Sequence, residues 1–445
     1  MGPVGQHPGI SRRAFTLTAL AGGALAACGV GGGATDGAAS KSTTPAKVSL
    51  YSRTNEQEAF TVRTAQLKQE QPHIDLEYLA LPGDYPLTIR THAAAGTLAD
   101  VLYLQNLVFE GLAVAGNLQP IDALIKRDKL DMKQWWEAGV KAFAFDGKQM
   151  GLPARGQIQH CWLYFNRDAF QRAGVREPAD TWTLDDLVSA ADKLTVRGTD
   201  QYGYGTMWSN FQRAIAATRR FGGDLLSADG KKSLVDSAPA LQAMQWHWEL
   251  WHRRQVAQPK SSAPADFGQA KVAMLGQMLA GQRGEIRTAV NDGFKWGMVL
   301  MPKGPTGKIG ADTSLAPVTL NAKARSVDAA WQVQQWFTNK ETGIALALQK
   351  TGSNTPGMRR DVYCDERVLT DPFYPREMLD RVCKAMEAHA ASIQYVVPAN
   401  FRQSEVDQLA KKHIDTFLAN EATPNSATMR TFHTELQAVL DLPRS

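Results

Sequence analysis

The clearest pattern in the chain is a run of apolar residues from Cys161 to Phe165, which follows a turn containing Gly151 and Pro153. An unbroken apolar run of this length is typical of a β-strand buried on both faces, and such a strand needs covering layers on both sides. The run therefore predicts a layered α/β domain. Further along, the apolar positions recur at helical spacing and predict one face of an amphipathic helix: Leu184, Leu187, Val188, Ala191 and Leu194.

Polar residues mark where the helices of this region begin and end. Residues 168–173 form a short helical segment that Gly174 stops. Thr183 then opens the longer helix, and Asp186 stands three residues later, where a capping box requires an acceptor side chain.

The opening part of the chain alternates between strand and helix patterns. Residues 48–51, 74–78 and 99–104 predict three strands, and a helix ending before Pro72 lies between the first two. This β-α-β-α-β order predicts a parallel sheet.

Polar residues follow two of these strands directly. Ligands in open α/β sheets sit beyond the carboxyl ends of the strands. This rule nominates Ser52 and Arg53 after the first strand, and Gln105 and Asn106 after the third. The alternative for each is a solvated loop residue.

Aromatic and amide side chains alternate with glycine over residues 202–212. Trp208 offers a flat apolar face and Asn210 a group that both donates and accepts hydrogen bonds, the pairing that a sugar ring requires. The alternative is that Trp208 fills the core. Trp248 and Trp251 have helical spacing on an apolar face, and we expect them in the core.

The first 27 residues lack Asp and Glu and place Arg12 and Arg13 before a short apolar stretch. The paired arginines predict a twin-arginine export signal, and residues 25–28 predict a lipobox with Cys28 as the lipidated residue. Residues 28–46 are rich in Gly, Ala, Ser and Thr, as in a flexible tether.

Charge and cysteine content narrow the function classes. The formal net charge is +5, and two of these charges belong to Arg12 and Arg13 of the leader, so nucleic-acid binding is disfavoured. Cys161 is expected to be a packing residue. Cys364 and Cys383 could form a disulfide or remain free thiols, and no cysteine has metal-ligand spacing.

No motif for catalysis, metal binding or cofactor binding stands out. A nucleophile elbow, a zinc-protease motif and a phosphate loop are all missing from the sequence. His247 and His252 are five residues apart and do not share a helix face. Paired carboxylates of a glycoside hydrolase are recognised only in space, so a lipid-anchored hydrolase stays open.

Several segments together resemble a known family. These are Gly151-Leu-Pro, the strand ending Leu-Tyr-Phe-Asn166, the Thr-Trp-Thr-Leu-Asp-Asp-Leu187 helix, Ala273-Met followed by Gly276-Gln277, and Gly352-Ser-Asn-Thr-Pro356. The chain resembles the extracellular solute-binding proteins, family 1, of ABC importers.

The resemblance implies a periplasmic-binding-protein fold, in which two α/β lobes are joined by three hinge crossings and enclose a ligand cleft. The first lobe would comprise residues 47–152 and 312–356, and the second residues 153–311 and 357–445. The crossings would lie at residues 151–153, 310–312 and 354–357. The 445-residue chain is long enough for two such domains.

The resemblance also implies cleft residues. Gln277 ends a strand at the cleft, and Asp312 and Asn354 lie at crossings, with a cap or turn role as the alternative. Arg155 follows the first crossing, and Tyr395 lies on a loop that could fold over the ligand.

The implied function is the capture of a sugar or oligosaccharide outside the cytoplasm and its delivery to an ABC-transporter permease. We expect a monomer that binds no cofactor, metal or nucleic acid, anchored by its N-terminal lipid in the cell envelope, in the periplasm or on the outer face of the cytoplasmic membrane. The alternatives are a binding protein for glycerol phosphate, polyamine or another small solute, which Arg53, Arg155 and Arg213 favour if the solute is anionic.

Overall fold

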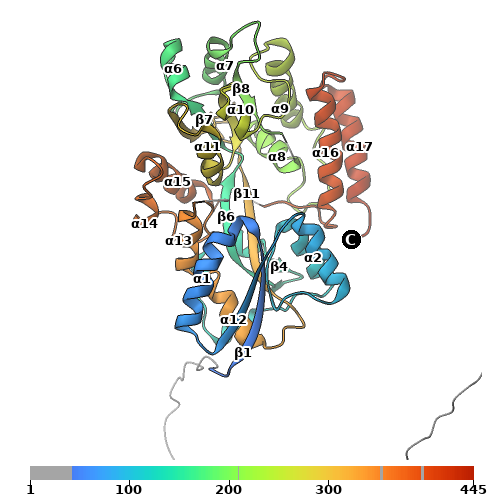
Figure 1. Ribbon diagram of the computed structural model, residues 1–445. Helices are drawn as coiled ribbons and strands as arrows, with labels where there is room; N and C mark the ends of the chain where they lie inside the picture. Colours follow the sequence, from blue (N-terminus) through green and yellow to red (C-terminus); the bar gives the residue numbers. More distant parts are fainter. Residues whose placement is uncertain (1–42, 209, 351–353, 392–394, 445) are drawn as a thin grey trace, which may run out of the picture. The chain divides into compact units, whose positions relative to one another are not determined.

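The computed structural model describes residues 43–208, 210–350, 354–391 and 395–444, except for the side chains of residues 106 and 107. It contains two larger β-sheets, each flanked by helices (Figure 1). The leader, Cys28 and most of the expected tether lie outside the described residues. Among the described residues, no helix combines the length and the apolar character needed to cross a membrane.

The first sheet has five strands in the order β2-β1-β3-β11-β6. Strand β1 pairs in parallel with both β2 and β3, so the predicted β-α-β-α-β unit is confirmed. Strand β11 runs antiparallel to both β3 and β6, and thereby joins a late segment of the chain to the opening unit. The strands are β1 (Ala46–Arg53), β2 (Ile74–Leu81), β3 (Val101–Tyr103), β6 (Gly151–Gln159) and β11 (Asp312–Leu320).

Helices from two separate stretches of the chain, residues 57–141 and 327–348, flank this sheet. Helix α12 contacts β1, β3 and β11, and α1 contacts β2 and α13. A small hairpin of β4 (Ala144–Phe145) and β5 (Lys148–Gln149) precedes β6. The helices of this region are α1 (Gln57–Glu70), α2 (Tyr85–Ala95), α3 (Asn106–Val114), α4 (Asp122–Arg127), α5 (Glu137–Lys141), α12 (Val327–Trp336) and α13 (Lys340–Leu348).

The second sheet has four strands in the order β10-β7-β9-β8. Strand β7 (Trp162–Asn166) lies inside the sheet with every residue buried, as its apolar run predicts. The other strands are β8 (Tyr202–Thr206), β9 (Val272–Met278) and β10 (Trp296–Leu300).

Helices of the second sheet follow the local signals of the sequence. Helix α6 (Arg167–Ala173) ends at Gly174, which has a φ of 63°. Helix α7 (Leu184–Leu194) begins with the predicted capping box between Thr183 and Asp186. The remaining helices are α8 (Phe211–Arg220), α9 (Ala238–Trp248), α10 (Pro264–Gly268), α11 (Arg283–Val290), α16 (Gln403–Leu418) and α17 (Ser426–Leu440).

The chain passes from the first sheet to the second at a different place from the one we expected. Residues 151–153 are the beginning of β6 and pair with β11, and the strand stays in the first sheet until Gln159. The passage to β7 lies at His160 and Cys161, and the return from β10 to β11 runs through residues 301–311. The glycine and proline that suggested a hinge therefore begin a paired strand.

Residues after the third expected crossing pack against the first core as well as the second sheet. Met358, Tyr363, Met378 and Met386 belong to the apolar cluster that contains the first sheet's core. This segment includes α14 (Glu366–Leu369) and α15 (Arg376–His389), and α15 contacts both β6 and β10. Helix α15 thus lies against strands of both sheets.

Candidate functional site

The end of β1 carries an ion pair that is largely shielded from solvent. Arg53 donates to both carboxylate oxygens of Glu56, with 3.0 Å from Nε to Oε2, and its side chain is 14% exposed. The Tyr103 hydroxyl donates to the same carboxylate at 3.1 Å. Ser52 is fully buried, and its hydroxyl lies 2.7 Å from that of Tyr78, whose pKa burial raises to about 12.

Gln105 lies at the same edge of the first sheet as Arg53, because β1 and β3 are parallel neighbours. It is half-buried at the N-terminus of α3, where its side chain forms no capping hydrogen bond. Asn106 is the first residue of α3, and its side chain is not described. The residues predicted from the carboxyl ends of β1 and β3 therefore lie at one edge of the sheet.

Arg155 reaches this edge from β6. Its charge acts on the hydroxyls of Tyr103 and Tyr363, opposing the rise in pKa that burial causes in both. Its Nε is buried and has no hydrogen-bond partner among the described residues. Arg155 and Arg53 thus converge on Tyr103, and the guanidinium of Arg53 lies 5.7 Å from the tyrosine ring centre.

Trp208 lies in the core of the second sheet's helical layer. It is 4% exposed, and its ring meets His247 edge to face at 4.7 Å and Trp251 at 5.9 Å. Trp251 is also 4% exposed, which confirms the core position predicted for it. The role of Trp208 in binding stays a prediction, and its surroundings are those of a packing residue.

Asn210 and Gln277 have internal partners. The Asn210 side chain accepts a hydrogen bond from the Arg213 backbone N at 3.2 Å and caps α8. Gln277 is fully buried, and its amide donates to Nε2 of His247 at 3.0 Å. Burial lowers the pKa of His247 to about 3, so the ring is neutral and can accept this bond.

Asp312 joins the two crossings to α8. It accepts a hydrogen bond from Gln159 at 3.1 Å and lies 3.9 Å from His160 and 3.8 Å from Arg219. Burial raises the pKa of Asp312 to about 6, although Arg219 and the hydrogen bonds oppose the shift. The position predicted from the resemblance is therefore a buried polar junction.

Asn354 is also buried, and its amide donates to the carbonyl oxygens of Ala347 at 3.1 Å and Gln349 at 2.5 Å. Tyr395 is half-buried and packs against the first apolar cluster. As solute-binding residues, both stay predictions.

Two arginines at the end of α8 hold the crossings, and our sequence reasoning did not single them out. Arg220 is fully buried and donates to the carbonyl oxygens of Ile309 at 2.9 Å, Gly310 at 3.4 Å and His160 at 3.5 Å. Arg219 donates to Ala311 at 3.1 Å. The sequence does contain a signal for them, because two arginines end a helix whose other residues are largely apolar. Arginines that are buried with such a helix need hydrogen-bond partners.

Gln157 of β6 is a further residue that our sequence reasoning did not single out. Its amide donates to Thr355 at 3.0 Å and accepts from the Gly281 backbone N at 3.0 Å, so it links β6 to the third expected crossing and to the segment that follows β9.

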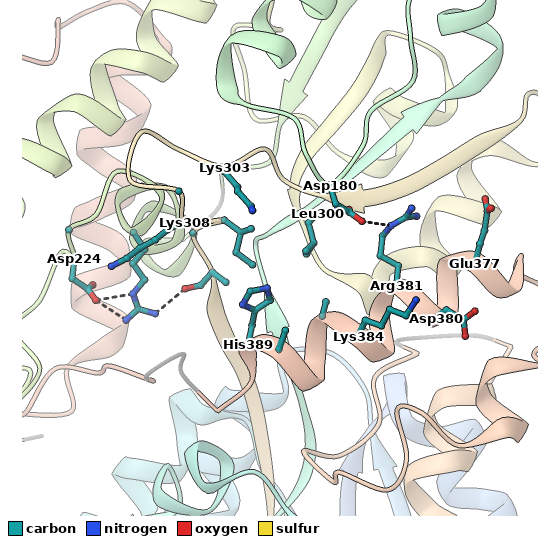
Figure 2. A pocket seen from close by; sticks show the side chains of 18 residues that line it. Asp180, Asp224, Leu300, Lys303, Lys308, Glu377, Asp380, Arg381, Lys384 and His389 are labelled. Atoms are coloured by element: carbon teal, nitrogen blue, oxygen red, sulfur yellow. Dashed lines mark hydrogen bonds and ion pairs between the residues drawn. The ribbon is translucent and has the colours of Figure 1, made fainter.

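A pocket of about 960 Å³ lies elsewhere, between α15, the segment of residues 300–311 and the end of α8 (Figure 2). None of the ten predicted ligand-binding residues whose side chains the structure describes lines it. Asn210 caps the N-terminus of α8, whereas Arg219, near the other end of this ten-residue helix, lines the pocket. A rise of ~1.5 Å per residue separates these ends by roughly 13 Å.

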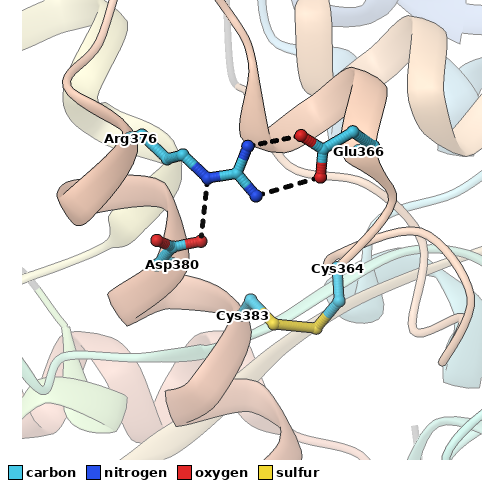
Figure 3. Close-up of a disulfide and its surroundings, with 5 residues drawn as sticks. All are labelled: Cys364, Glu366, Arg376, Asp380 and Cys383. Carbon is cyan, nitrogen blue, oxygen red and sulfur yellow. Dashed lines mark hydrogen bonds and ion pairs between the residues drawn. A yellow bond between two sulfur atoms is a disulfide. The ribbon is translucent and has the colours of Figure 1, made fainter.

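Cys364 and Cys383 form a disulfide, with a Cα–Cα distance of 5.1 Å, which resolves the question that the sequence left open (Figure 3). Within the described residues, the only three-residue group with metal-ligand proximity is Cys364, Cys383 and Glu387. Because its two sulfurs are bonded to each other, they are not available as thiolate ligands.

Known proteins resemble this chain in sequence and in fold. The sequence profile of the bacterial extracellular solute-binding proteins matches residues 52–344. A Brucella abortus (strain 2308) protein described only as a binding protein is 27% identical over 285 residues, which are 61% of this chain and 66% of that protein.

Solved structures match over more of the chain. An ABC substrate-binding protein from Listeria monocytogenes in complex with cycloalternan has a TM-score of 0.74 at 17% identity and covers 88% of this chain and 98% of its own. UgpB from Mycobacterium tuberculosis in complex with glycerophosphocholine has a TM-score of 0.75 at 16% identity, with coverages of 89% and 98%. At these identities the likeness establishes the fold, and the profile establishes the family: the chain belongs to the bacterial extracellular solute-binding proteins, which act outside the cytoplasm.

Proposed function

We propose that this protein is the lipid-anchored solute-binding component of an ABC importer, and that it binds a sugar or oligosaccharide between two lobes built on its two sheets. Proteins of the same fold support a sugar as the solute, since they include structures with cycloalternan and with maltotriose. In this proposal the lobes close on the sugar, and a membrane permease receives it. The protein acts as a monomer, without catalysis or a cofactor.

The observation that carries the proposal is the polar edge formed by Arg53, Glu56, Gln105 and Arg155. These groups come from three different segments of the first sheet and include both hydrogen-bond donors and acceptors. Sugar hydroxyls require both kinds of partner, held on rigid elements. Arg155 is the member with a buried nitrogen that has no partner among the described residues.

An anionic solute such as a glycerol phosphate derivative is the second candidate. UgpB has the same fold and was solved with glycerophosphocholine. Two of the three arginines that favoured an anion have internal partners, because Arg53 pairs with Glu56 and Arg213 donates to the Gln277 carbonyl oxygen. Of these three arginines, only Arg155 still supports an anionic solute, because its Nε lacks a hydrogen-bond partner among the described residues.

A thermal-shift screen of the mature protein tests the solute class. Maltose, maltotriose, cycloalternan, glycerophosphocholine and spermidine are the probes. A solute at about 100 times its Kd stabilises the folded state by roughly 2.7 kcal/mol, which is readily detected as a rise in Tm. We expect a rise with a saccharide, and a rise only with glycerophosphocholine would favour the second candidate.

Closure and anchoring have separate tests. Small-angle scattering should show a smaller radius of gyration with the identified solute, and an unchanged radius at saturation would contradict closure.

Cys28→Ala should release the protein from the membrane fraction of the cell envelope, and retention in that fraction would contradict the lipid anchor.

A further inference from the structure

The pocket beside α15 has the size of a small-molecule site. Its volume of about 960 Å³ lies within the range of ~300–1,000 Å³ that is typical for ligand pockets. One wall is a single face of α15, and the opposite wall is the chain that returns from the second sheet to the first (Figure 2). Side chains that the proposed sugar site does not use therefore line a second cavity.

The acidic side chains of this pocket all have basic partners. Asp180 pairs with Arg381 at 3.2 Å, and Asp224 pairs with Arg219 at 2.8 Å. At the other end, Glu377 pairs with Arg167 at 3.0 Å, and Asp380 lies 3.7 Å from Arg376, which also binds Glu366 (Figure 3). The negative charge of the lining is thus largely compensated.

The lysines of the pocket differ from the acids in this respect. Across the described ranges, no carboxylate lies within ion-pair distance of Lys303, Lys308 or Lys384. Figure 2 shows Lys303 pointing toward His389 from the opposite wall. The two groups are close enough for the charge of Lys303 to add to the effect of burial in lowering the pKa of His389.

Apolar residues also line the pocket. Leu300, Ile309, Ala311, Ala385 and Ala388 contribute to the lining. A ligand that matches this lining therefore combines negative charge with a carbon skeleton. We propose that this pocket binds a small organic anion with two or more negative charges, with Lys303 and Lys384 as its main cationic contacts.

The lining of the pocket includes none of the residues of the proposed polar edge, and part of it lies on the crossing from β10 to β11. Its wall includes Ile309, Gly310 and Ala311, whose carbonyl oxygens accept hydrogen bonds from Arg219 and Arg220. The disulfide between Cys364 and Cys383 ties the middle of α15 to the segment before α14. Hydrogen bonds therefore fix one wall of the pocket, and a disulfide fixes the other.

Isothermal titration of the full mature protein with citrate tests the proposal at constant ionic strength, and inorganic pyrophosphate tests whether phosphate can replace carboxylate. The variant Lys303→Gln with Lys384→Gln should weaken citrate binding by roughly five- to tenfold, because it removes two exposed charge contacts. Lys68→Gln is the matched control, since Lys68 is an exposed lysine of α1, and it should change the Kd by less than about twofold.

Two further variants make the result decisive. Ala388→Trp fills the pocket from the exposed side of α15 and should abolish binding without removing a charge. Arg155→Gln should leave citrate binding unchanged. Three outcomes would contradict the proposal. The first is that wild-type protein binds neither anion at about 10 mM, a concentration at which even very weak binding is detected. The others are that the double lysine variant binds like wild type, or that Arg155→Gln removes the binding.

Discussion

The predicted binding residues of the first sheet differ from those of the second sheet in how far the rest of the protein covers them. Arg53, Gln105 and Arg155 lie at strand ends or in the outer strand β6, and each is only partly buried. The Nε of Arg155 also lacks a hydrogen-bond partner among the described residues. Trp208 and Gln277 lie under covering layers, and their partners are other protein groups. Residue type can therefore suggest a binding residue, but whether a solute can reach the side chain depends on how many other elements cover it.

The largest expected effect is on the buried side of this comparison. Trp208→Ala should lower the free energy of unfolding by about 3 to 5 kcal/mol, because it removes a large side chain from a packed core. Urea denaturation of the solute-free protein measures this change. Leu87→Ala, at a position that is 60% exposed, is the control and should have little effect. Unaltered stability with a large loss of affinity would instead make Trp208 a solute platform.

Asp312 provides a pH test of the buried side. Its pKa of about 6 in the folded protein is raised from 3.8, so between these values the folded state binds a proton that the unfolded state does not. Stability should therefore fall as pH rises from about 4 to 6, by roughly 2 kcal/mol for this group.

The variant Asp312→Asn isolates this contribution. The difference in unfolding free energy between wild type and variant should change over the same pH window, with wild type relatively more stable at the acidic end. A difference that does not vary with pH would mean that folding does not raise the pKa of Asp312.

Arg155→Gln tests the exposed side of the comparison. It should weaken binding of the identified solute by roughly tenfold, as expected for loss of a charge-assisted hydrogen bond of about 1.4 kcal/mol. The melting temperature without solute should stay close to that of wild type. Titration calorimetry and a thermal melt of the same preparation decide between a binding role and a purely structural one.

Asn210 gives the smallest expected effect. Asn210→Ala should lower the free energy of unfolding by about 1 kcal/mol through loss of the α8 cap, and Asn210→Ser should recover most of it. If Asn210→Ser restores stability but not affinity, Asn210 also contacts solute. If both recover together, capping explains its presence.

Much of the local structure follows from short-range signals in the sequence. The apolar run at residues 161–165 becomes the buried strand β7, and Thr183 with Asp186 forms the predicted capping box. The strand-end rule also brings Arg53 and Gln105 to one edge, because parallel neighbouring strands must end on the same side. These features depend on residues close together in the chain or on simple sheet geometry.

The features that only the tertiary structure decided depend on distant segments. Pairing with β11 makes residues 151–153 part of a strand, and packing of α15 brings Cys383 to Cys364. Gln277 is buried because distant helices cover it: its amide donates to His247 of α9, and Arg213 of α8 donates to its carbonyl oxygen. Local sequence encodes the periodicity and the caps of an element, whereas the solvent exposure of a side chain depends on which remote elements cover it, and that is settled only when the chain packs.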